Sequence, residues 1–215
     1  MNFLGHALIS LTLDEAQQRH TLYGNFAGDF YKGPLADLAL PAALREGVRL
    51  HRIIDRLSDH ADNPLYPLLD GFGRYKGIVA DMFIDHFLCR EFQQLFRQDL
   101  HIVATDILHR VAHYRPHFPD AFARTFAWLD TEQMLSRYGD RAILTRAFAG
   151  IAQRLRQGDI LTTATAVLAA NDAAFADKAV QAFFQVRRES IAQFLRDDLK
   201  GDLYEYMIGR IQTAG

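Results

Sequence analysis

Histidines and carboxylates recur at helical spacing in the first 90 residues of the chain. His51 precedes Asp55 by four positions, and Asp81 precedes Asp85 by the same interval. Residues four apart lie on one face of a helix, so each pair can direct its side chains toward a common point. Helical proteins build metal centres from oxygen and imidazole ligands carried on several helices. The candidate metal ligands are His6, Asp29, His51, Asp55, Asp81 and Asp85.

Two earlier segments supply the remaining ligands. His6 lies in an apolar opening stretch, residues 1–9, where a histidine packed in the core is the competing interpretation. Asn25 and Asp29 are again four positions apart and would present two oxygens on one face, with Asn25 expected to contact substrate. Their segment, 20–32, also holds two glycines, and a glycine inside a helix costs about 1 kcal/mol relative to alanine. The glycines therefore favour close approach of another helix or of a ligand.

The predicted helix 41–58 has three distinct faces. Its apolar residues form one stripe that should face the core, and His51 and Asp55 project from a second sector. A narrow basic stripe forms the third face and consists of Arg45, Arg49, Arg52 and Arg56. In the competing interpretation the arginines are simply solvated, and His51 and Asp55 hydrogen-bond each other.

The predicted helix 76–98 carries two carboxylates inside its apolar stripe. Burying Asp81 and Asp85 in ionised form is costly, and two nearby carboxylates repel each other. Either arginines or a cation must neutralise them, and a hard divalent cation would relieve both problems. His86 points about 100° away from Asp85. It could reach the edge of the same site as a proton donor, or it could pack as a core histidine.

The rest of the chain follows helical periodicity, with prolines at plausible boundaries and no long alternating run of the kind a β-strand shows. This predicts an all-α helical bundle in which residues 1–215 form a single domain. Residues 158–170 could be helix or loop. The predicted helices are 2–12, 20–32, 41–58, 65–72, 76–98, 101–115, 119–136, 139–157 and 171–199.

Composition narrows the class of protein. Hydrophobic residues make up 49% of the chain and charged residues 23%, which is ordinary for a globular protein, and the formal net charge of −2 argues against a nucleic-acid binder that works by bulk charge. The single cysteine, Cys89, excludes an intramolecular disulfide and suits a reducing compartment. We find neither a signal peptide nor an apolar run long enough to span a membrane. A cytoplasmic protein with no membrane partner is expected.

Four segments together resemble a known family. They are the opening Met-Asn-Phe-Leu-Gly-His of residues 1–6 and the stretches 24–30, 51–59 and 81–88. In order and spacing they are similar to those of the bacterial acyl carrier protein phosphodiesterases. That resemblance implies removal of the 4′-phosphopantetheine arm from holo acyl carrier protein to give the apo form, with a divalent cation, Mn²⁺ or Mg²⁺. It also implies a bundle like that of the His-Asp metal-dependent phosphohydrolases, although here the doublet is reversed, as Asp85-His86.

The resemblance suggests roles for the other polar residues. A divalent metal activates water and neutralises charge on phosphoryl oxygens. Arg52 would hold a phosphate oxygen, and His86 would protonate the leaving group or orient water. The carrier protein is strongly acidic, so Arg45, Arg49 and Arg56 would steer it to the site. The alternatives are a helical metal-dependent phosphohydrolase that acts on a nucleotide, and a non-enzymatic helical binding module whose polar clusters are structural.

Overall fold

The computed structural model describes residues 1–213, with side chains as far as residue 201, and all regular structure in that range is helical. The predicted all-α fold is therefore confirmed. The α-helices are α1 (Phe3–Gln17), α2 (Leu22–Phe26), α3 (Ala42–Ser58), α4 (Lys76–Arg90), α5 (Phe92–Phe96), α6 (Leu100–Ala112), α7 (Asp120–Thr131), α8 (Met134–Arg137), α9 (Arg141–Ala152), α10 (Ala164–Ala170) and α11 (Asp172–Thr213). Short 3₁₀ helices join them at Gly28–Phe30, Leu35–Asp37, Tyr66–Leu68, Asp70–Tyr75, Arg115–His117 and Gly158–Thr163.

Several predicted helices are shorter in the structure than in the sequence-based assignment. The predicted helix 20–32 ends at Phe26 and continues as a 3₁₀ helix from Gly28, because the chain there must pass tightly against His51. The predicted helix 76–98 breaks at Glu91 into α4 and α5. Local periodicity does not show such breaks, because the apolar pattern continues across them.

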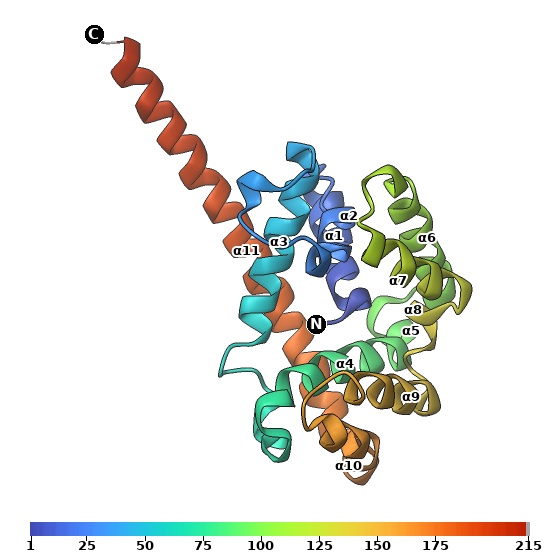
Figure 1. Cartoon of the computed structure of the whole chain (residues 1–215). Coiled ribbons are helices and arrows are strands. Elements are labelled where there is room, and N and C mark those ends of the chain that lie inside the picture. Colours follow the sequence, from blue (N-terminus) through green and yellow to red (C-terminus); the bar gives the residue numbers. More distant parts are fainter. Residues whose placement is uncertain (214–215) are drawn as a thin grey trace.

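Helices α1, α2, α3 and α4 form the part of the bundle that positions the polar residues (Figure 1). Helix α2 begins where the buried carboxylate of Asp14 accepts hydrogen bonds from the backbone N–H groups of Thr21 and Leu22, at 2.9 and 3.2 Å. These bonds satisfy amides that a helix start leaves unpaired. Because Asp14 belongs to α1, they also tie the start of α2 to that helix.

The backbones of α2 and α3 touch at a pair of glycines. A Cβ atom added to Gly24 would lie 2.2 Å from the backbone oxygen of Leu44, and one added to Gly47 would lie 2.3 Å from that of Thr21. No side chain fits at either position, which offsets the intrinsic cost of glycine in a helix. The contact sets the distance between α2 and the helix that carries His51 and Asp55.

The long helix α11 closes the bundle on the side of α3 and α4 and then extends beyond it (Figure 1). Its aromatic residues Phe175, Phe183 and Phe194 are fully buried in the hydrophobic core. Within the part of the chain that the structure describes, no helix combines the length and apolar character that crossing a bilayer would require.

Candidate metal centre

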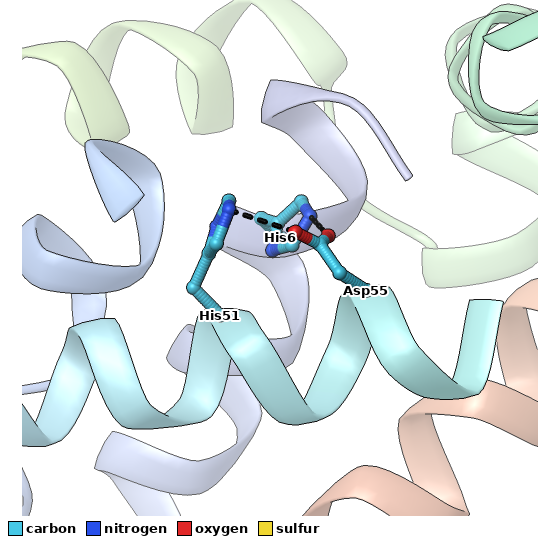
Figure 2. A group of neighbouring side chains, drawn as sticks. All are labelled: His6, His51 and Asp55. Atoms are coloured by element: carbon cyan, nitrogen blue, oxygen red, sulfur yellow. Dashed lines mark ion pairs between the residues drawn. The ribbon is translucent and has the colours of Figure 1, made fainter. Parts of the chain in front are cut away.

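Three side chains from two helices converge at one point. His51 and Asp55 come from α3, one turn apart, and His6 reaches them from α1 (Figure 2). The Nε2 atom of His6 lies 3.1 Å from Oδ1 of Asp55, and that of His51 lies 3.0 Å from Oδ2. The two imidazole rings stack with their centroids 4.3 Å apart. Potential ligand atoms of all three residues lie within 4.8 Å of one another.

Asn25 on α2 orients both histidines. Its side-chain oxygen accepts a hydrogen bond from Nδ1 of His6 at 2.7 Å, and its backbone oxygen accepts one from Nδ1 of His51 at 2.8 Å. Its amide nitrogen donates to the backbone oxygen of His6 and to Ser10. Because an oxygen acceptor requires the proton on Nδ1, Nε2 is the nitrogen of each ring that can bind a ligand once it is deprotonated. We expected Asn25 to contact substrate, but it is fully buried behind the two rings.

The donor set fits a divalent cation. The Nε2 atoms of His6 and His51 are buried, and neither has a well-aligned hydrogen-bond partner within the described part of the chain. Buried polar atoms are normally satisfied, so two such nitrogens facing one carboxylate indicate a missing ligand. Adjacent ligands of an octahedral ion with bonds of about 2.1 Å lie about 3 Å apart. The separations of 3.1 and 3.0 Å between these nitrogens and Asp55 match that spacing.

Charges within the cluster are strongly coupled. Burial lowers the pKa of His6, and the neighbouring His51 lowers it further. Burial also opposes charge on His51, but the carboxylates of Asp29 and Asp55 beside its ring outweigh burial and raise its pKa to about 9. Burial would raise the pKa of Asp55, yet the two imidazoles in close contact with its oxygens hold it well below the usual range. A cation bound here would replace the proton on His51.

Asp29 lies at the mouth of the cluster. Its carboxylate is 73% exposed, and Oδ1 lies 3.7 Å from Nε2 of His51 and 3.9 Å from Nζ of Lys32. The nearby imidazole of His51 lowers the pKa of Asp29, so this carboxylate is ionised at neutral pH. Asp55 is 40% exposed, whereas both histidines are buried. The cluster therefore opens to solvent on its carboxylate side.

Asp81 and Asp85 lie outside this three-residue cluster. The fully buried Asp85 accepts hydrogen bonds from the backbone N–H groups of Leu4 and Gly5, at 2.8 and 3.1 Å, and burial raises its pKa to about 7. Asp81 pairs with the Met1 amino group at 2.5 Å. The sequence predicted that arginines or a cation would neutralise these carboxylates, and the cation beside Asp81 is the Met1 ammonium group. Asp85 holds the start of α1, the turn that contains His6, because its carboxyl oxygens accept from amides that a helix start leaves unpaired.

His86 is buried between α4 and α8. Its Nδ1 donates to the backbone oxygen of Tyr138 at 2.8 Å, and it has no exposed surface. Burial lowers its pKa, so the ring is neutral at pH 7. The geometry corresponds to a core histidine, one of the two interpretations of the sequence.

Three of the four arginines on α3 bind elsewhere in the chain rather than forming a free basic face. Arg45 donates to the backbone oxygen of Ala36 at 2.9 Å. Arg49 stacks on Phe194 with its guanidinium carbon 3.7 Å from the ring centroid, and it also pairs with a carboxylate of α11. Arg52 donates to backbone oxygens of the loop that follows Asp29, including that of Gly33 at 2.7 Å. Arg56 is exposed.

Sequence reasoning missed the role of Gly28. A Cβ atom at this position would lie 2.2 Å from Cγ of His51, so only glycine leaves room for the imidazole ring. The signal was present, since glycine inside a helical pattern indicated a close approach. Its partner, 23 positions later on another helix, could not be read from the sequence.

Comparison with known proteins points to one family. A family model described as acyl carrier protein phosphodiesterase matches residues 1–186. A relative with the same name from Yersinia pestis is 28% identical over 163 residues, which cover 72% of this chain and 79% of the relative. One from Serratia proteamaculans is 27% identical over 159 residues, with 72% and 79% covered. An Escherichia coli relative is 28% identical over 166 residues, with 75% and 82% covered.

No solved structure matches the chain. The matched residues, 1–186, include the whole His6, His51 and Asp55 cluster and both helices that carry it. The chain belongs to the acyl carrier protein phosphodiesterase family.

Proposed function

We propose that this protein hydrolyses the phosphodiester that joins the 4′-phosphopantetheine arm to holo acyl carrier protein, and that it does so with a divalent cation at the cluster of His6, His51 and Asp55. The observation that carries the proposal is a pair of buried Nε2 atoms that face the carboxylate of Asp55 in a chain of this family; neither has a well-aligned hydrogen bond among the described residues. Phosphodiester hydrolysis requires an activated water and neutralisation of phosphoryl charge.

His6, His51 and Asp55 would hold the ion, with Asp29 as a further ligand reached by rotation of its exposed side chain. Nitrogen and carboxylate ligands suit Mn²⁺ or Mg²⁺, and such an ion supplies Lewis-acid activation of water. Asn25 keeps both imidazoles in the tautomer that a ligand requires. Asp85 keeps the start of α1 in place, and His6 with it. Asp81 and Asp85 thereby act through position rather than by ligation.

We propose that the carrier protein approaches from the carboxylate side of the cluster. Arg56 and Lys32 are exposed near this side, Arg56 next to Asp55 and Lys32 3.9 Å from Asp29. Exposed cations increase the rate at which an acidic partner reaches its site. Arg45, Arg49 and Arg52 bind groups of this chain, so they would contribute to docking through their positive charge rather than by direct contact with the carrier protein.

The test is direct. Holo acyl carrier protein is incubated with the protein and Mn²⁺, and intact-mass measurement follows conversion to the apo form. Conversion should stop with a chelator, return with added Mn²⁺ and be lost in Asp55→Asn, while Asp62→Asn, which changes an exposed carboxylate elsewhere, serves as the matched control. A folded wild-type protein that binds Mn²⁺ but leaves the holo form intact would refute the proposed substrate. Full activity of Asp55→Asn would refute the proposed metal site.

A further inference from the structure

A groove opens beside the metal centre between α4, α7 and α9. Its volume is about 660 Å³, within the range of pockets that hold small organic ligands. Its apolar lining includes Phe30, Met82, Trp128, Met134 and Ile151. A larger groove, about 1120 Å³, lies over the far half of α1 and includes none of the cluster residues. Only the smaller groove approaches the proposed chemistry.

Two residues connect this groove to the metal centre. Phe3 lines the groove and lies one turn before His6 on α1, so the two side chains are neighbours on one helix face. Phe30 also lines it and directly follows Asp29, at the mouth of the cluster. A ligand that extends from the cluster past Phe3 and Phe30 would therefore enter the groove.

We propose that this groove is the subsite for the pantetheine arm of the substrate; the inference rests on the proposed function. The arm begins at the phosphate and continues through a gem-dimethyl carbon, two amides and a terminal thiol. It is therefore a narrow chain with alternating apolar and polar parts. The phosphodiester is the point at which the arm leaves the carrier protein, so with the phosphate at the cluster the arm must extend away from the carrier surface. The groove provides the apolar path that such a chain needs.

Polar side chains also line the groove. Asn2 and Thr125 line the groove, as do Arg146 on α9 and Arg154 in the turn that follows this helix. Neither arginine forms an ion pair with any side chain that the structure describes as far as residue 201. Their guanidinium groups can therefore donate to carbonyl oxygens of the arm. A mixed lining of this kind distinguishes an amide-bearing chain from a purely hydrocarbon ligand.

The chain's only tryptophan, Trp128, lines the groove and is 43% exposed, so its fluorescence reports occupancy. Titration with pantetheine, which lacks the phosphate, should change the Trp128 signal in a saturable manner. Ala147→Phe places a ring inside the groove and should weaken pantetheine binding at least tenfold, and it should raise the KM for holo acyl carrier protein more than it lowers kcat. Gly150→Leu is a second filling variant, because a Cβ at Gly150 meets nothing within 4 Å.

The matched control is Ala142→Phe, on the exposed face of the same helix and outside the groove, which should leave pantetheine binding and KM unchanged. Mn²⁺ affinity and thermal unfolding of each filling variant should match the wild type, which separates a blocked groove from a damaged centre. The inference is overturned if wild-type protein shows no saturable response to millimolar pantetheine, or if both filling variants bind it as well as the wild type does. Pantetheine binding by a protein that leaves holo carrier protein intact would support the groove and refute only the proposed function.

Discussion

Gly28 leaves the space in which the imidazole of His51 sits, and Gly28→Ala would remove that space. The added Cβ would lie 2.2 Å from Cγ of His51 and 2.6 Å from its Cβ and Cδ2. Carbon atoms in contact normally stay about 3.5–4.0 Å apart, so the ring or the loop must move by about 1 Å or more. Such a shift breaks the 2.8 Å bond from Nδ1 of His51 to Asn25 and turns Nε2 away from Asp55.

The size of the effect follows from these contacts. Losing a hydrogen bond of this kind costs about 0.5–1.5 kcal/mol, and overpacking costs about 1–3 kcal/mol when the surroundings cannot yield. Because His51 is held by the bond and the contact together, we expect Mn²⁺ affinity to fall at least tenfold, which is about 1.4 kcal/mol. Activity should fall about 10²-fold, the usual result of a misplacement of about 1 Å.

Calorimetric titration with Mn²⁺ measures the affinity. Denaturant unfolding shows whether Gly28→Ala lowers the free energy of unfolding instead. Gly71→Ala is the control, because a Cβ there meets nothing within 4 Å. Wild-type Mn²⁺ affinity in Gly28→Ala, with unchanged stability, would show that His51 does not need this geometry and that the proposed ligand set is wrong.

Three further outcomes follow from the charges. Because the raised pKa of His51, about 9, lies above neutral pH, Mn²⁺ binding at pH 7.5 should release about one proton, seen as buffer-dependent calorimetric heat and lost in His51→Gln. The pKa of Asp85 rises from 3.8 to about 7 on folding. Its protonated form therefore stabilises the fold below about pH 4, and this stability is lost as the pH rises through 7. At about 1.36 kcal/mol per pKa unit, the stability lost is about 4 kcal/mol. The difference in unfolding free energy between wild type and Asp85→Asn should change by this amount between pH 4 and 8, and a constant difference would contradict it. Arg56→Glu should slow carrier-protein association in a salt-dependent way. Arg49→Glu should mainly lower the free energy of unfolding, because it breaks the contact with Phe194. Equal effects of the two variants on the association rate would refute the separate roles assigned to Arg56 and Arg49.

Helical periodicity was enough to predict the all-α fold and the face of α3 that carries His51 and Asp55. Both follow from the spacing of residues within one helix, which can be counted in the sequence. The choice of His6 as their partner depended on a lone histidine in an apolar segment, and the structure brings these three together.

The neighbours of Asp81 and Asp85 could not be predicted in the same way. Periodicity correctly placed Asp85 on the buried face of α4, whereas Asp81 is only half-buried, and the cost of burying a carboxylate correctly required a partner. The partner of Asp85 is the backbone at the start of α1, about 80 positions away. Every residue except proline has a backbone amide, so residue type does not show which amides will pair with a carboxylate. The neighbours of the arginine stripe on α3 could not be predicted for a related reason, because Arg49 packs against Phe194 of α11, a distant part of the chain.

Asn25 has a consequence for ion selectivity. One residue supports both rings, and α2, which carries it, is in backbone contact with α3 at Gly24. The two imidazoles therefore cannot move apart independently to bind a cation of larger ionic radius. Displacing one ring strains the hydrogen bond of the other to Asn25 and brings the backbones of α2 and α3 closer together. We expect a rigid metal site of this kind to discriminate by size, so the proposed ion would be Mn²⁺ or Mg²⁺ rather than Ca²⁺, through the stiffness of the scaffold as well as the chemistry of the donors.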